Sequence, residues 1–159
     1  MSAASCTLAL VWFMVNNFTR ELADEAATLA AGRDFSQQLK PGLTIYLHGD
    51  LGAGKTTFVR GVLQGLGHIG KVKSPTFTLV EPYVININVK YSYDVYHFDL
   101  YRFNDEEEWE AAGFREYFNE DSICFVEWPE KAKNCLPKPD VDVKLSHIAE
   151  GRNLEIITY

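Results

Sequence analysis

A glycine-rich stretch places the strongest constraint on what this chain can fold into. Residues 49–56 read GDLGAGKT and match the pattern G-x-x-x-x-G-K-[ST] at every fixed position. Residues 43–47, which precede it, form an apolar, β-branched run typical of a buried strand. Apolar residues then recur at helical spacing: Phe58, Val59, Val62, Leu63 and Leu66. Strand, glycine loop and helix in this order are the context of a phosphate-binding loop.

This loop predicts a site for a nucleoside triphosphate. Glycines let successive backbone N–H groups turn inward around a phosphate, and the helix N-terminus adds its partial positive charge. Lys55 is expected to reach the β- and γ-phosphates, and the Thr56 hydroxyl to ligate Mg²⁺. Gly65 and Gly67 predict the end of the helix. The loop residues expected to bind the nucleotide are Gly49, Asp50, Leu51, Gly52, Ala53, Gly54, Lys55, Thr56 and Thr57.

The size and charge of the chain limit the classes of protein to which it can belong. Its 159 residues suffice for a single core, so residues 1–159 are predicted to form one P-loop domain. A hydrophobic content of 47% and a charged content of 23% are ordinary for a globular protein. The net charge of −7 provides no surface-wide basic field, which argues against a free-standing DNA- or RNA-binding protein.

The cysteines and one apolar run bear on location. Cys6, Cys124 and Cys135 are odd in number and lack C-x-x-C spacing, so the sequence favours a reducing compartment over a disulfide framework or a zinc site. The apolar run at residues 8–15 is far shorter than the ~20 residues of a membrane helix and lacks the flanks of a signal peptide. We interpret it as a buried first strand and expect a cytoplasmic protein without membrane association.

The segment before the glycine loop predicts a helix. Asp24 is expected to cap it, and the helix is expected to run to about Leu39. Its apolar stripe would consist of Leu22, Leu29, Phe35 and Leu39.

The remaining elements predict an α/β protein. Residues 74–80 indicate the beginning or edge of a strand because Pro75 cannot lie in a central one. The other expected elements are a hairpin at 84–95, a helix from the acidic run 105–108 to about residue 118, a buried strand at 122–127, a short helix at 129–136, and strands at 141–145 and 153–158. The fold class is therefore a P-loop NTPase-like three-layer domain, with a central mixed, largely parallel sheet flanked by helices.

Two carboxylates are candidates for the chemistry. Glu127 ends a buried strand, where a P-loop protein needs an acidic partner for Mg²⁺; the alternative is a surface glutamate at a strand end. Asp99 lies in an apolar, aromatic stretch, where a carboxylate is costly to bury without a purpose. It could hold metal-bound water or orient the attacking water, or it could instead form a structural ion pair with Arg102.

Weaker signals surround these acids. Ser74 and Thr76 could contact the γ-phosphate and Mg²⁺ as a switch segment does, or only cap a strand. Trp128 follows Glu127 directly and could lie beside the nucleotide, a partner or the core. The four histidines, His48, His68, His97 and His147, share no metal-ligand spacing, and we interpret them as packing or surface residues.

Four stretches occur together in one known family, in its order and spacing. They are GDLGAGKTTF at 49–58, SPTFTLV at 74–80, HFDLYR at 97–102 and VEWP at 126–129. The chain resembles the TsaE family, small bacterial P-loop ATPases of tRNA threonylcarbamoyladenosine biosynthesis, over about residues 22–157. The middle two stretches are far more specific than the P-loop alone.

The resemblance implies an ATPase that works with the TsaB and TsaD proteins, whose assembly modifies adenosine 37 of tRNA. The chain would bind ATP at the TsaB–TsaD complex and reset it between turnovers by hydrolysis, meeting tRNA only through that complex. By resemblance, Thr56 and Glu127 bind Mg²⁺, Asp99 assists hydrolysis or the metal, and Trp128 lies near the nucleotide. Base-side contacts would fall near Glu25 to Thr28 and near Gly151 and Arg152. The long hairpin after residue 83 departs from the family's shorter connections and leaves the partner surface open.

Two other functions compete with this one. A small-molecule P-loop kinase usually carries an arginine-rich lid, and this chain has no arginine between Arg115 and Arg152. A non-hydrolysing, ATP-dependent scaffold would differ in releasing no phosphate.

Overall fold

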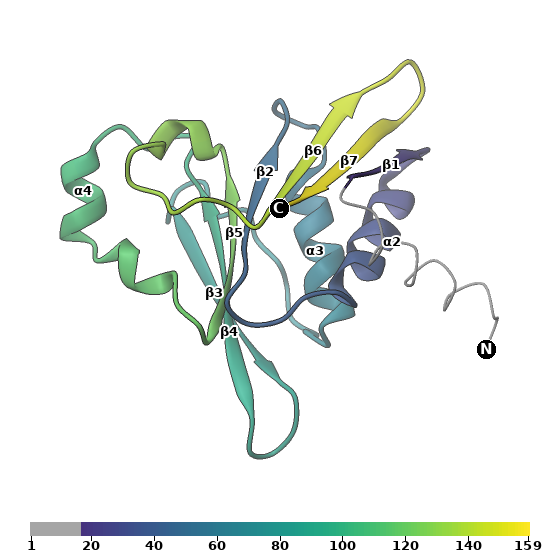
Figure 1. Ribbon diagram of the computed structural model, residues 1–159. Helices are drawn as coiled ribbons and strands as arrows, with labels where there is room; N and C mark the ends of the chain where they lie inside the picture. The colour runs from purple at the N-terminus through teal and green to yellow at the C-terminus, as the bar shows by residue number, and fades with distance from the viewer. Residues whose placement is uncertain (1–16) are drawn as a thin grey trace.

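The computed structural model describes residues 17–159, whose strands form one seven-stranded sheet (Figure 1). In spatial order the strands run β1-β7-β6-β2-β5-β4-β3. Their bounds are β1 Asn17–Leu22, β2 Thr44–His48, β3 Val80–Asn86, β4 Ser92–Asp99, β5 Ser122–Glu127, β6 Val141–His147 and β7 Arg152–Thr158. The P-loop strand β2 therefore lies in the middle of the sheet.

The sheet is mixed, as the sequence predicts. The central strands β6, β2, β5 and β4 pair in parallel. The outer pairs β1–β7, β6–β7 and β3–β4 are antiparallel. Parallel strands end at the same edge of a sheet, so the loops after β2, β4 and β5 meet at one edge.

Helices cover both faces of this sheet, which confirms the three-layer architecture (Figure 1). The helices α2 (Glu25–Ser36) and α3 (Lys55–Gly65) pack together on one face. The short helix α4 (Glu106–Ala111) and the 3₁₀ turns η1 (Phe114–Tyr117) and η2 (Pro129–Ala132) cover the other. The core accordingly has two parts, one around Phe58 and one around Trp109.

Two glycines let α2 and α3 approach closely. A Cβ at Gly32 would clash with the Phe58 carbonyl oxygen, and a Cβ at Gly61 would clash with the Leu29 carbonyl oxygen. Backbone therefore lies against backbone where the helices cross. This contact anchors α3, whose first residue is Lys55.

The helix caps follow the sequence closely. Asp24 is the N-cap of α2, because its Oδ1 accepts a hydrogen bond of 2.8 Å from the Ala27 N–H. The helix α3 ends in a Schellman arrangement, in which Gly67 has φ +95° and the His68 N–H donates to the Leu63 carbonyl. Both boundaries confirm the prediction.

Other boundaries differ from the prediction around α2. The helix ends at Ser36 and not near Leu39, because the amides of residues 37–39 bond to carbonyls three positions back and tighten the turn. Leu22 ends the strand β1 and is not part of the helix. That edge strand was not predicted, since only Leu22 among its residues is fully buried.

The segment 74–80 is also different from the prediction. Residues 76–79 form turns, and a strand begins only at Val80. Leu79 has φ +66°, and its N–H donates to the Pro75 carbonyl at 2.7 Å. The serine and threonine hydroxyls bond to Asp99, which folds the segment over the end of β4 and not into the sheet.

The remaining elements largely match. The hairpin at 84–95 is confirmed, with strands that extend to Val80 and Asp99, and it reaches past the rest of the sheet (Figure 1). The buried strand at 122–127 and both final strands are confirmed. The helix predicted at 105–118 breaks at Gly113, whose φ is +69°, and the one at 129–136 is only a 3₁₀ turn.

Two expectations fall on the N-terminal residues. The strand predicted at residues 8–15 and Cys6 lie outside the described part of the chain. Among residues 17–159, no helix has the length and apolar character needed to cross a membrane. In that part Cys124 and Cys135 are free thiols.

Candidate functional site

The register of three parallel strands gathers the predicted site residues at one edge of the sheet. In the β2–β5 pair Leu47 lies opposite Glu127, and in the β4–β5 pair Asp99 lies opposite Glu127. The phosphate-binding loop starts two residues after Leu47, at Gly49. The loop and the two carboxylates therefore meet where β2, β4 and β5 end.

The loop has the backbone conformation of a phosphate cradle. Gly54 is the N-cap residue of α3 and has φ +104°, a left-handed conformation that favours glycine. At Gly49 a Cβ would lie 2.5 Å from the Leu145 carbonyl oxygen, so any side chain would push the loop off β6. The Ala53 N–H closes the turn by donating to the Asp50 carbonyl at 3.0 Å. The helix then begins at Lys55, with its free N–H groups facing the loop.

Lys55 lies folded into this loop. Its Nζ donates to the carbonyl oxygens of Gly49 and, at 3.0 Å, of Asp50. It also lies 4.4 Å from the ring centroid of Trp128, within range of a cation–π interaction. Burial lowers the pKa of Lys55 below its usual value, while the negative charges of Glu127 and Asp99 oppose that shift.

Glu127 is the centre of a buried hydrogen-bond network. Its side chain is 4% exposed. Its Oε1 accepts a hydrogen bond of 2.9 Å from the Thr56 hydroxyl and contacts His97 Nε2 at 2.8 Å. The alternative of a surface glutamate is therefore wrong. The network joins the first turn of α3 to the ends of β4 and β5.

His97 is a site residue that the sequence reasoning missed. The sequence predicts a packing or surface residue; the side chain is fully buried, as a packing residue would be, but its ring contacts Glu127. Its Nδ1 has no hydrogen-bond partner in the described part of the chain. A usable signal was present: His97 and Asp99 are two residues apart on one strand, so their side chains share a face.

Asp99 is buried with hydroxyl and backbone partners. Its Oδ2 accepts hydrogen bonds from Thr76 at 2.9 Å and from Ser74 at 3.4 Å, and its Oδ1 accepts one from the Tyr101 N–H at 3.0 Å. The ion pair with Arg102 is not formed, since that guanidinium lies over the Phe77 ring at 4.5 Å. Asp99 thus forms no ion pair within residues 17–159, and its carboxylate lines the same cavity as Lys55 and the loop.

Trp128 adopts an unusual backbone conformation at the site. Its φ and ψ are +57° and +50°, values that non-glycine residues seldom adopt. Its ring lies 5.1 Å from that of Tyr101 and beneath Lys55. Backbone strain of this kind clusters at functional sites, and here it directs the indole toward the loop.

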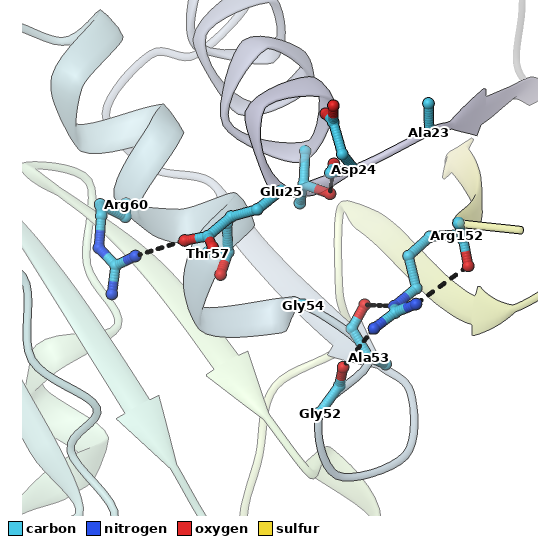
Figure 2. A pocket seen from close by; sticks show the side chains of 11 residues that line it. Ala23, Asp24, Glu25, Gly52, Ala53, Gly54, Thr57, Arg60 and Arg152 are labelled. Atoms are coloured by element: carbon cyan, nitrogen blue, oxygen red, sulfur yellow. Dashed lines mark hydrogen bonds and ion pairs between the residues drawn. The ribbon is translucent and has the colours of Figure 1, made fainter.

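These groups line two adjoining cavities. A cavity of about 240 Å³ is bounded by loop residues 51–57 together with Ser74, Thr76, Asp99, Glu127 and Trp128. A second cavity of about 480 Å³ lies against the other side of the loop (Figure 2). Both are lined by Gly52, Ala53, Gly54 and Thr57.

The second cavity brings together residues that the sequence predicted on the base side. Glu25, Thr28 and Gly151 all line it, although they come from α2 and from the turn before β7. Figure 2 shows Arg60 from α3 reaching Glu25, with an N···O distance of 3.5 Å. Their contact with a nucleotide base stays a prediction, and their place around one cavity is compatible with it.

The donor set near Lys55 fits a hard cation such as Mg²⁺. The Thr56 hydroxyl and the Glu127 carboxylate are hydrogen-bonded to each other and line the smaller cavity, and oxygen atoms of this kind are the ligands that Mg²⁺ prefers. Residues 17–159 contain no cluster of three or more His, Cys, Asp and Glu that could hold a metal.

The fold and the loop define the class: this is a P-loop α/β protein. A family model described as "Threonylcarbamoyl adenosine biosynthesis protein TsaE" matches residues 22–154. The chain is 48% identical over 148 residues to the tRNA threonylcarbamoyladenosine biosynthesis protein TsaE of Haemophilus influenzae, covering 90% of each chain. The protein of that name from Rickettsia felis is 37% identical over 139 residues, which are 86% of this chain and 78% of the relative.

A solved structure agrees with this assignment. The crystal structure of Bacillus subtilis YdiB superposes with a TM-score of 0.73 at 30% identity, covering 91% of this chain and 87% of that one. The chain belongs to the TsaE family of threonylcarbamoyladenosine biosynthesis proteins.

The His97–Glu127 contact leads to a prediction about stability. His97→Ala removes one of the two side-chain partners of a buried carboxylate, which should cost about 2 kcal/mol or more of unfolding free energy. His97→Gln can still donate to Glu127 and should lose less. Urea unfolding measures both, with the exposed His147→Ala as a control expected within about 0.5 kcal/mol of wild type. Equal losses for alanine and glutamine would contradict a hydrogen-bonding role.

Proposed function

We propose that this chain binds and hydrolyses ATP with Mg²⁺ as the ATPase of the tRNA threonylcarbamoyladenosine machinery. The observation that carries the proposal is the convergence of Lys55, Thr56, Glu127 and Asp99 on one cavity beside the phosphate-binding loop. Membership of the TsaE family supports a role in threonylcarbamoyladenosine biosynthesis, and the residues of the cavity support ATP binding and hydrolysis. All described strands share one sheet, and we propose that residues 1–159 act as a single domain.

In this proposal the loop binds the phosphates. Lys55 exchanges its two carbonyl acceptors for oxygens of the β- and γ-phosphates, a short movement of a flexible side chain. The lowered pKa of Lys55 reflects burial, and a bound polyanion would restore the preference for the charged form. The N–H groups at the start of α3 supply further donors.

The acids divide the remaining work. Thr56 and Glu127 hold Mg²⁺, which neutralises charge that grows on the phosphates during transfer. Asp99 orients the attacking water, because it lines the cavity and its direct side-chain partners are the hydroxyl groups of Ser74 and Thr76. A direct contact between Asp99 and the metal is the alternative role. His97 keeps the Glu127 carboxylate in place.

The second cavity accepts the rest of the nucleotide. It adjoins the loop and has a volume of about 480 Å³, within the ordinary range for small-molecule sites. Its lining includes Glu25, Thr28 and Gly151, which we propose lie close to the base of the nucleotide. Trp128 lies at the phosphate end, against Lys55.

We propose that the TsaB–TsaD complex is the partner and that hydrolysis resets it between turnovers, in the cytoplasm, with tRNA met only through that complex. Among the described residues that line the cavity near Asp99, Lys55 is the single cation, as Arg102 lies over Phe77 and Arg60 reaches Glu25. A partner that supplies or rearranges a cation would therefore accelerate hydrolysis. Leu51, which lines the cavity, is 64% exposed, and Phe77, which follows the lining residue Thr76, is 80% exposed. These apolar side chains provide a surface for that partner.

The competing functions are a small-molecule kinase and a non-hydrolysing scaffold. A kinase needs cationic groups around a second substrate, and the segment after β5 offers no arginine before Arg152. Release of phosphate from ATP separates the ATPase from both alternatives.

The division of roles predicts different effects for the two acids. Glu127→Ala should weaken Mg²⁺-dependent ATP binding and abolish hydrolysis, since it removes a metal ligand. Asp99→Asn keeps a hydrogen-bond acceptor for Thr76, so it should preserve ATP affinity and lose turnover. Calorimetric titration and steady-state phosphate release measure the two effects, with Lys55→Ala as the background for contaminating ATPases. Equal losses of affinity in both variants would refute the division.

Partner dependence is tested by phosphate release at saturating ATP. We expect slow hydrolysis by the isolated chain and a rise of at least about tenfold with the TsaB–TsaD complex, equal to ~1.4 kcal/mol of barrier. Phe77→Ser should reduce the stimulation, whereas Val89→Ser at the exposed hairpin tip should not. Fast basal hydrolysis that ignores the complex would indicate a self-sufficient enzyme, and loss of stimulation only in the hairpin variant would move the partner surface there.

A further inference from the structure

Arg152 makes an unusual contact with the phosphate-binding loop. Its Nε donates to the Ala53 carbonyl at 3.1 Å and its Nη2 to the Gly52 carbonyl at 3.0 Å (Figure 2). A third donor, Nη1, bonds to the carbonyl of Gly151 at 3.0 Å. One guanidinium thus holds two consecutive carbonyls of a loop about a hundred positions away in the sequence.

The sheet determines where this side chain points. Arg152 begins β7 and is paired on both sides, with Leu22 of β1 and His147 of β6. Its side chain shares a face with Leu154, which is buried under the helices α2 and α3. The preceding Gly151 has φ +97°, and a Cβ there would clash with the Leu22 carbonyl. The backbone of Arg152 is therefore fixed by pairing with two neighbouring strands and by a preceding turn that requires glycine.

The contact has a consequence for the donors of the loop. In a peptide unit the C=O and the following N–H point in opposite directions. Because Arg152 holds the Ala53 carbonyl, the N–H of Gly54 points away from Arg152. That N–H has no acceptor in the described part of the chain, and Gly54 lines both cavities. It is a free donor, already oriented, beside Lys55.

We propose that Arg152 is a positioning residue that fixes the peptide between Ala53 and Gly54, so that the Gly54 N–H is aligned for a phosphate before the ligand arrives. The inference rests on the proposed function, since it takes the ligand of the loop to be a nucleotide polyphosphate. Without Arg152 this peptide can rotate, and ordering it reduces the free energy of binding.

The geometry requires arginine and not just a positive charge. A guanidinium is a planar fork with several fixed donors, whereas a lysine ammonium is a single point of charge on a flexible stem. Arg152→Lys should therefore keep the local charge and lose the simultaneous contact with both carbonyls. Arg152→Gln loses the charge as well.

The test compares nucleotide-free and ligand-bound properties of wild type, Arg152→Lys and Arg152→Gln. Loss of the clamp should weaken ADP–Mg²⁺ about tenfold in Arg152→Gln and at least about fivefold in Arg152→Lys. Pyrophosphate should weaken by the same factors, because the effect acts through the phosphate donors. Backbone NMR relaxation should give a lower order parameter for the Gly54 amide in both variants without any ligand, because the peptide is then less restrained.

Arg20→Gln is the matched control. Arg20 lies on β1 and bonds to Asp34, away from the loop, so its variant should keep the wild-type affinities and the wild-type Gly54 order parameter. Unchanged exchange of the β6 and β7 amides shows that each variant is folded.

Three results would overturn the inference. Wild-type affinity for ADP and pyrophosphate in Arg152→Lys would mean that only the positive charge of Arg152 matters, and not its two hydrogen bonds to the loop. Weaker ADP binding with unchanged pyrophosphate binding, or with an unchanged Gly54 order parameter, would indicate direct contact with the ligand. Unchanged ADP affinity in both variants would remove Arg152 from the site. If wild type itself bound neither ADP nor pyrophosphate, the proposed function would fail, while the relaxation data would still report on the clamp.

Discussion

The parallel pairing of β2, β5 and β4 is the constraint on which the rest of the site depends. Its register places Leu47 opposite Glu127 and Glu127 opposite Asp99, so the loop and both acids emerge at the same edge. Strand pairing alone therefore brings Asp99, Glu127 and the glycine loop together, although they are far apart in the sequence. The helix α3 completes the arrangement, because Gly32 and Gly61 let it lie directly against α2 with Lys55 at the mouth of the site.

Glu127 both connects structural elements through hydrogen bonds and is a candidate for the chemistry of the site. Burying its carboxylate beside Asp99 is expensive, and hydrogen bonds from Thr56 and His97 offset only part of that cost. The left-handed backbone of Trp128 adds strain immediately after it. Buried charge and backbone strain thus destabilise the fold at the place where, in the proposed function, a cation and a polyphosphate bind, which is the usual distribution for a binding site.

Local signals in the sequence predicted much of this structure. The glycine loop, the Asp24 cap and the Gly67 helix end depend on near neighbours, and each is confirmed. The strand at 74–80 failed because its hydroxyls bond to Asp99, a partner some twenty residues away. Alternation along β4 could have placed His97 on the face of Asp99. The His97 contact with Glu127 depends on strand register, and the Arg152 contact lies on a loop about a hundred residues distant, and local patterns encode neither.

The central claim is that the two adjoining cavities form one nucleotide site, with phosphates beside Lys55 and the base beside Thr28. Amide NMR spectra of the protein with Mg²⁺ and either pyrophosphate or ADP test it most directly. Both ligands should shift the amides of Gly54, Lys55 and Thr56. Only ADP should also shift those of Thr28 and Gly151. Shifts from ADP that spare Gly54 to Thr56, or pyrophosphate shifts that already include Thr28 and Gly151, would contradict the account.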